Sequence, residues 1–109
     1  MQYKEVADII KSIGIPFAYR KFTDQTEKVP PFIVYFYDGN DDMFADNVNY
    51  QTIAGLRIEL YTTNKDFALE AAVESVLKNN EIAYSKDEIF IEDQNVNEIV
   101  YESEVVING

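Results

Sequence analysis

Two segments with the pattern of β-strands flank an acidic stretch between residues 32 and 61, and this arrangement constrains the fold most strongly. Apolar and polar residues alternate from Tyr50 to Thr62, which is typical of a half-buried strand. The segment Phe32–Tyr37 is apolar at every position, as expected of a strand that is buried on both faces. We therefore predict two neighbouring strands, joined by a turn or longer loop that Asp38-Gly39 opens and that runs through Asn47. No nucleophile–base pair lies within or near them.

Gly55 interrupts the alternation of the second strand. A glycine inside a strand marks a bulge, a close backbone approach or a local bend. We interpret Gly55 as a bend in a long strand, with the bulge or close approach as the alternative.

Two amphipathic helices are predicted, about residues 2–13 and about Lys65 to Lys78. Gly14 is expected to end the first helix as a left-handed cap, and Pro16 prevents its continuation. Thr63 or Asn64 is expected to cap the second helix, and Asn79-Asn80 to provide its left-handed exit. The apolar stripes that define the helices are Val6, Ile9, Ile10 and Ile13, and then Leu69, Ala72, Val73, Val76 and Leu77, with Phe67 at the edge.

Three further strands complete the prediction. The expected segments are Pro16–Phe22, then Ile82–Lys86 with Glu88–Glu92 as one kinked strand or a tight pair, and finally Asn97–Ile107 after a turn at Asp93–Asn95. Residues 23–28 are expected to form a loop, and Pro30-Pro31 to impose an extended backbone before the next strand. The prediction is therefore a single domain over residues 1–109. It is of the α+β class, with two helices on one mostly antiparallel five-stranded sheet in the order α-β-β-β-α-β-β.

The charge of the chain narrows the class of partner. Twenty acidic residues against nine basic ones give a formal net charge of -11. Binding of nucleic acid depends on Lys and Arg that displace counterions, so this balance argues against it and against anionic membranes. It suits solubility, a basic partner, or a surface that must avoid adhesion to DNA. The 8 Tyr and 7 Phe indicate either a sheet face with high β propensity or aromatic rings in an intersubunit contact.

The residue types that usually perform chemistry are missing. The chain has no cysteine and no histidine, which removes disulfides, thiolate metal sites and the usual general base. No apolar run approaches the roughly 20 residues that span a bilayer, and Met1–Glu5 lacks the order of a signal peptide. We therefore expect a soluble, intracellular protein with no cofactor and no membrane association.

Two arrangements of acidic residues could in principle bind a metal ion or act in catalysis. The segment Asp38–Asp46 partly resembles a calcium-binding loop, but Met43 occupies the position that needs glycine and Asn49 the position of the closing glutamate. Glu59 with Glu102 or Glu104 could form a pair of catalytic carboxylates. Such pairs are expected by chance among 20 acids, and no phosphate-binding loop or nucleophile motif accompanies them. We predict no catalytic, cofactor-binding or metal-ligating residue, and hence no enzyme.

Three regions remain as candidates for contact with other proteins: the acidic stretch, the segment before it, and the last strand. The acidic residues of the last strand indicate either an ordinary solvent-facing side of the sheet or a charged stripe that lines a subunit contact or channel. The candidate interface residues are Asp38, Asp41, Asp42, Phe44 and Asp46, then Lys28 and Pro30, and finally Glu102 and Glu104.

Five segments carry a resemblance to a known family: Tyr3–Tyr19, Pro30–Tyr37, Phe44–Asn47, Ile58–Phe67 and Asn97–Val105. Together they resemble the small tail-terminator or tail-completion proteins, which join head and tail in long-tailed phages and in prophages of Gram-positive bacteria. The resemblance covers nearly the whole chain and rests on a general pattern without an invariant motif.

The resemblance implies a compact subunit of the virion tail, assembled in the bacterial host cytoplasm. It implies a hexameric ring on the end of the tail tube that stops polymerisation and docks to the head connector. The partners would be the major tail tube protein and the connector proteins, and DNA would pass through the ring without specific binding. A lumen lined with carboxylates would repel that DNA.

A second hypothesis is a small acidic inhibitor that mimics DNA or antagonises a basic enzyme. Such a protein would be a monomer or dimer with carboxylates spaced like phosphates along one face. The measured mass separates the two hypotheses, because a discrete hexamer or a complex with a tube end favours the terminator.

Overall fold

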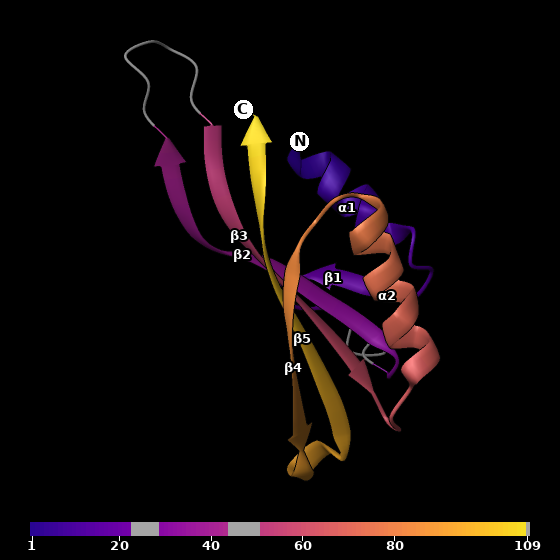
Figure 1. The fold of residues 1–109 in the computed structure, drawn as a ribbon. Helices are drawn as coiled ribbons and strands as arrows, with labels where there is room; N and C mark the ends of the chain where they lie inside the picture. Colours follow the sequence, from indigo (N-terminus) through magenta and orange to yellow (C-terminus); the bar gives the residue numbers. More distant parts are fainter. Residues whose placement is uncertain (23–28, 44–50, 109) are drawn as a thin grey trace.

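The computed structural model describes residues 1–22, 29–43 and 51–108, and its elements follow the predicted order (Figure 1). The sheet has the strand order β1-β2-β3-β5-β4. Only the pair β1–β2 is parallel, and the other three pairs are antiparallel. This arrangement confirms the α+β prediction. The elements are α1 (Tyr3–Lys11), β1 (Phe17–Tyr19), β2 (Phe32–Met43), β3 (Gln51–Thr62), α2 (Phe67–Asn79), β4 (Tyr84–Ile91), the 3-10 turn η2 (Glu92–Gln94) and β5 (Val96–Asn108).

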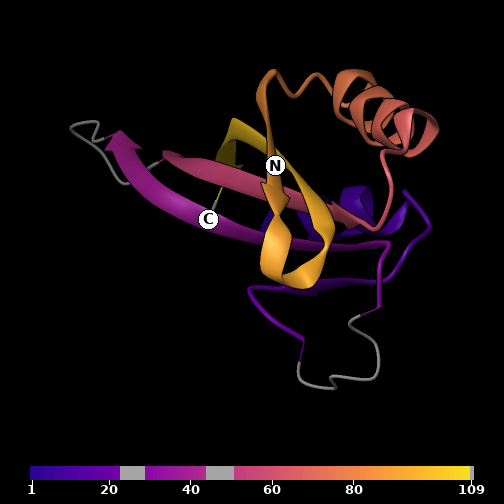
Figure 2. The same ribbon diagram turned by 90° about the horizontal axis from the view of Figure 1, so that it is seen from below.

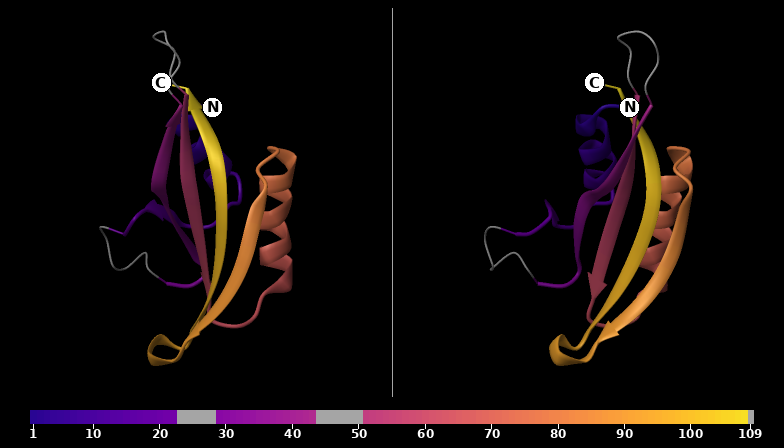
Figure 3. Two further views of the ribbon diagram at one scale, coloured as in Figure 1. Left: turned by 60° about the vertical axis from the view of Figure 1, so that its left-hand side comes forward. Right: turned by 90° about the vertical axis from the view of Figure 1, so that its left-hand side faces the viewer.

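Both helices cover the same face of the sheet, as Figure 3 shows. Val6 and Ile10 of α1 and Val73 and Leu77 of α2 are buried there, which confirms the central positions of both apolar stripes. Burial of each such side chain contributes about 1.5–3 kcal/mol. The sheet side of this core includes Ile33, Tyr35, Leu56, Ile58, Leu60, Ile99, Tyr101, Val105 and Ile107.

A smaller apolar cluster lies on the other face of the sheet. Phe22, Phe32 and Val34 are buried there, and residues 20–22, which follow β1, lie on the side of the sheet opposite α2 (Figure 2). The ring of Tyr61 stacks on Phe32 with 4.8 Å between centroids. The first half of β2 is therefore buried on both faces, as its apolar sequence predicted. We call this face, away from the helices, the open face of the sheet.

The prediction of a turn at Asp38 is wrong, because β2 continues through it to Met43. The register between β2 and β3 shifts between Tyr37 and Asn40, where Gly39 adopts φ +78°. One extra residue is thus accommodated as a bulge, and pairing resumes beyond it. The acidic stretch begins in a strand, and the residues from 44 to 50 lie outside the described part of the chain.

Gly55 faces this bulge, and our interpretation of it as a simple bend is wrong. A Cβ atom on Gly55 would lie 2.0 Å from the backbone oxygen of Asp38. The two backbones therefore approach more closely than any side chain allows, which is the alternative reading of a glycine within a strand.

The helix ends were predicted in part. Gly14 has the expected left-handed conformation, with φ +91°, but α1 ends earlier than predicted, at Lys11, and its cap is Ser12. The cap of α2 is Asp66, whose carboxylate accepts the backbone N–H of Leu69 at 3.0 Å, and not Thr63 or Asn64. The left-handed residue after α2 is Glu81, with φ +59°, and neither Asn79 nor Asn80.

Two members of the predicted stripe of α2 are exposed. Ala72 is exposed, and Phe67 is 74% exposed with Lys65 Nζ 4.8 Å from its ring centroid. Leu69 and Val76 are half-buried, so the fully buried part of the stripe is narrower than predicted.

The C-terminal part forms a hairpin. Tyr84–Ile91 is one strand, as in the first of the two predicted alternatives, and Asn95 with φ +52° completes the turn after η2.

Among the described residues, no helix combines the length and the apolar character needed to cross a bilayer.

Candidate functional site: a groove on the open face

A groove of about 550 Å³ crosses the open face at the level of the bulge. It brings together three residues that the sequence singled out from two distant segments, Asp38 of β2 and Glu102 and Glu104 of β5. The remaining lining residues are Gly55, Leu56, Arg57, Ala83, Tyr84, Ser85 and Ser103. The groove therefore extends from the bulge, over β3 and β5, to the start of β4.

The shape of the groove follows from the strand register. Gly55 pairs with Glu104, and Arg57 pairs with Glu102, so these residues form two adjacent rows across β3 and β5. Gly55 has no side chain, and the backbone of Asp38 at the bulge occupies the place that a Cβ atom would take. The sequence indicated that Gly55 was unusual. It could not show the strand pairing that places Gly55 between Asp38 and Glu104.

Arg57 is the cation of the groove, and its charge is already engaged. Its Nε lies 2.8 Å from Glu59 Oε2, and its Nη1 lies 3.0 Å from Glu102 Oε1. The hydrogen bond to Glu59 raises the pKa of Arg57. Glu59 and Glu102, which the sequence offered as a catalytic pair, are therefore joined by a guanidinium as structural ion pairs. Among the groove-lining residues, Asp38 and Glu104 have no ion pair within the described residues.

The charged row continues from the groove toward Tyr61. Tyr61 Oη lies 3.0 Å from Glu59 Oε1 and 2.8 Å from Glu98 Oε2. Glu98 is only 8% exposed, and burial raises the pKa of its carboxyl. Burial also raises the pKa of Tyr61, so this phenol stays protonated and serves as a donor. We call Arg57, Glu59, Tyr61, Glu98 and Glu102 the open-face network; it holds one cation for three carboxylates.

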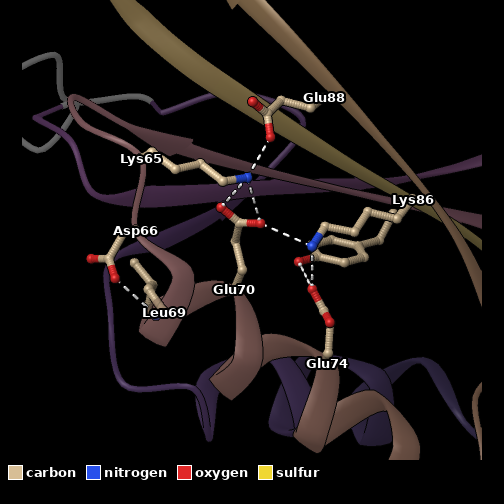
Figure 4. A network of polar contacts seen from close by, with 8 residues as sticks. Lys65, Asp66, Leu69, Glu70, Glu74, Lys86 and Glu88 are labelled. Carbon is tan, nitrogen blue, oxygen red and sulfur yellow. Dashed lines mark hydrogen bonds and ion pairs between the residues drawn. The ribbon is translucent and has the colours of Figure 1, made fainter.

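A second network lies between α2 and the sheet (Figure 4). Glu70 is 1% exposed, with Lys65 Nζ 2.9 Å from its Oε2 and Lys86 Nζ 2.9 Å from its Oε1. Lys86 also lies 2.7 Å from Glu74 Oε2, and Lys65 contacts Glu88. We call these residues, together with Tyr101, the helix-side network.

Tyr101 completes the helix-side network by donating to Glu74 Oε2 at 2.8 Å. The hydrogen bonds to Glu74 and Glu70 raise the pKa of Lys86. Burial raises the pKa of Glu74, but the hydrogen bonds from Lys86 and Tyr101 outweigh it and lower that pKa overall. Lys65 contacts Glu70 of α2 and Glu88 of β4, and Lys86 of β4 contacts Glu70 and Glu74 of α2. We therefore interpret this network as the attachment of α2 to β4.

A second cavity, of about 530 Å³, is lined by four tyrosines and Gly39. Tyr3 and Tyr37 meet edge to face at 4.9 Å, and Tyr19 meets Tyr35 in the same way at 5.3 Å. Burial raises the pKa of Tyr37. Sequence reasoning missed this cluster, although the alternation of Tyr35 and Tyr37 was a signal that both rings share a face.

The structure places three of the other predicted interface residues in the fold. Asp41 and Asp42 lie in the second half of β2, and Pro30 is half-buried just before that strand, in a cis peptide bond with Pro31. Lys28, Phe44 and Asp46 lie outside the described residues. Within the described residues, no group of three or more potential ligands could hold a metal ion.

The comparisons with known proteins give a likeness of fold to solved structures. No protein-family model matches the chain, and no curated protein matches it. Among solved structures, the chain is similar to a chain of the structure described as "Virion of native gene transfer agent (GTA) particle". The TM-score is 0.56 at 12% sequence identity, over 99% of this chain and 90% of that chain. At this identity the likeness concerns the fold, and it extends over nearly the full length of both chains.

Proposed function

We propose that the chain is a structural subunit of a phage-like particle at the junction of tail and head. In this function it forms a hexameric ring that caps the tail tube, stops its polymerisation and docks to the head connector. The observation that carries the proposal is the full-length likeness of fold to a chain of a gene transfer agent virion. The resemblance of five sequence segments to tail-terminator proteins supports the same function independently.

The surface chemistry supports a role in contact rather than catalysis. Glu59 and Glu102, one of the two pairs that could have acted as acid and base, are held by Arg57. In contrast, Asp38 and Glu104 of the groove are left without an ion pair among the described residues, beside an unbalanced network. A surface of this kind is suited to a partner that brings cations of its own.

A closed ring is a suitable geometry for a protein that caps the end of a tube. A subunit whose front surface contacts the back surface of the next forms a closed ring when the rotation between them divides the circle. The completed ring covers the growing end of the tube without offering the surface that the tube subunits recognise. The net charge of -11 would, where it faces the bore, repel the DNA that passes through.

Tube polymerisation in vitro tests this function. The purified major tail tube protein of the same particle would be polymerised with and without the chain, and tube lengths would be measured by electron microscopy. We expect short tubes with a ring at one end, and a hexameric mass for that ring by native mass spectrometry. Unchanged tube lengths, with no bound chain at the tube ends, would contradict the proposal.

The cation deficit of the open face also favours the second candidate, an acidic inhibitor of a basic enzyme. That candidate requires a monomer or dimer that binds a DNA-processing enzyme with steep salt dependence. The same mass measurement decides between the two.

A further inference from the structure

The outer edge of β5 is only half covered. β4 pairs with β5 from Val96 as far as Ser103, whereas β3 pairs with β5 all the way to Asn108. Figure 1 shows the upper part of β5 extending past the start of β4. Within the described residues, no strand lies beside Glu104–Ile107 on the side that β4 leaves.

The backbone groups on this edge point outward. Asn108 donates its backbone N–H to Met1 O at 2.8 Å, on the side away from β3. Because strand residues alternate in the direction of their N–H and C=O groups, those of Glu104 and Val106 point to the same side. These two residues therefore offer donors and acceptors for an added strand.

This edge is not protected in the way that the edge formed by β4 is. The outer strand β4 carries Lys86, Asp87 and Glu88 in succession, and charges of this kind block the addition of another strand. The uncovered part of β5 instead reads Glu104-Val105-Val106-Ile107, with a single charged residue followed by three apolar ones, and Val106 is 41% exposed. The contrast indicates that the edge formed by β4 is closed to an added strand, whereas the uncovered edge of β5 is open to one.

The groove lies directly beside the uncovered edge. It is lined by Ser103 and Glu104 of β5 and by Ala83, Tyr84 and Ser85 at the start of β4. The groove has a volume of about 550 Å³, and its lining continues along β5 to Glu104, the first residue of the uncovered edge. Its carboxylates exceed its cations, since Arg57 is already paired with Glu59 and Glu102.

We propose that the β5 edge at Glu104–Ile107 binds an extended segment of another protein as an added strand, with basic side chains at alternate positions over the groove. Main-chain hydrogen bonds to Glu104 and Val106 would supply the alignment, and Asp38, Glu102 and Glu104 would select Lys or Arg. This inference deepens the proposed function, because it names the chemistry of the partner that the junction subunit contacts.

A peptide with alternating Lys and Val, labelled with fluorescein, is the probe. Its binding to the full chain would be followed by fluorescence anisotropy, beside the same peptide with Glu for Lys and a version N-methylated at alternate residues. We expect saturable binding of the basic peptide alone. N-methylation would weaken it about tenfold or more, since each lost hydrogen bond costs about 1 kcal/mol.

Two variants of matched character locate the site. Val106→Lys introduces a charge on the uncovered edge and should abolish binding, whereas Ile89→Lys places the same charge on β4, where Ile89 is 46% exposed, and should leave binding unchanged. The double variant Glu102→Gln with Glu104→Gln should weaken it about tenfold. Circular dichroism would confirm that each variant is folded.

Several results would overturn the inference. Equal binding of the N-methylated peptide would show that charge alone is recognised, and equal loss with Ile89→Lys would place the site elsewhere. Self-association that Val106→Lys disrupts, without any peptide binding, would assign the edge to a second copy of the chain. Tube capping without peptide binding refutes only this inference, whereas peptide binding without tube capping refutes only the proposed function.

Discussion

The two charged networks of the protein lie on opposite faces of one sheet and differ in how completely they are balanced. The helix-side network places two lysines among three carboxylates and encloses Glu70, which is 1% exposed. The open-face network has only Arg57 for Glu59, Glu98 and Glu102, and it adjoins the groove with Asp38 and Glu104.

This difference separates a role in folding from a role in contact. A buried carboxylate that is paired on both oxygens holds two elements together, and its removal leaves cations without a partner. Exposed carboxylates without cations contribute little to folding and remain available to a partner. Composition alone, with its net charge of -11, could not distinguish the two.

The largest expected effect comes from adding a side chain to Gly55, where the backbones of β2 and β3 approach closely. Gly55→Ala would place a Cβ 2.0 Å from Asp38 O, so the strands must separate at the bulge. We expect a loss of about 3 kcal/mol in the free energy of unfolding, measured by urea denaturation. Gly14→Ala is the control: it has φ +91° but no atom within 4 Å of the added Cβ, and should lose about 1 kcal/mol. Equal losses for both variants would show that the approach at Gly55 is not tight.

The next largest effect tests the helix-side network. Glu70→Ala removes the buried carboxylate that pairs with Lys65 and Lys86, and we expect a loss of about 2 kcal/mol in the free energy of unfolding. The loss is smaller than for a fully buried pair because each lysine keeps a second acidic partner. Glu88→Ala, at the exposed end of the network, should change stability by less than about 0.5 kcal/mol. A loss for Glu88→Ala as large as for Glu70→Ala would contradict the structural role of Glu70.

A substitution of Glu98 tests whether the open-face network has too few cations for its carboxylates. Burial raises its pKa, so the folded chain binds this proton more tightly than the unfolded chain does. Its contribution to stability is therefore fully present below the usual carboxyl pKa of 4.5 and is lost as pH rises through the folded pKa. Glu98→Gln, which keeps the acceptor for Tyr61, should raise the free energy of unfolding at pH 7 by about 1 kcal/mol. It should also flatten the pH dependence above 4.5, and a decrease in stability at pH 7 would refute this view.

The smallest effect is expected at the groove carboxylates. Glu102→Gln and Glu104→Gln should each change the free energy of unfolding by less than about 0.5 kcal/mol, because both residues are exposed. Thermal denaturation measures this directly. A loss of more than 1 kcal/mol from either would assign these residues to folding and erase the distinction between the two faces.

The fold could be predicted further than the site. Alternation and helical spacing gave the element order, because each element buries a single periodic face. The bulge at Asp38–Gly39 could not be predicted, since an Asp-Gly pair is equally suited to a turn and only the pairing with Gly55 decides between them.

The candidate site was predicted by residue type but not by arrangement. Asp38, Glu102 and Glu104 were singled out as separate candidates, and only the strand register brings them into one groove. The sequence also placed Glu59 and Glu102 near each other without showing that Arg57 lies between them. Long-range register depends on packing of the whole sheet, which local patterns do not encode.

Hydrogen–deuterium exchange of the chain bound to tail tubes tests the central claim most directly, namely that the open face contacts the partner while the helix side maintains the fold. The account predicts new protection of the backbone amides of Glu104 and Val106, with exchange in α2 and β4 unchanged. Protection confined to α2 and β4, with Glu104 and Val106 exchanging as in the free chain, would contradict it.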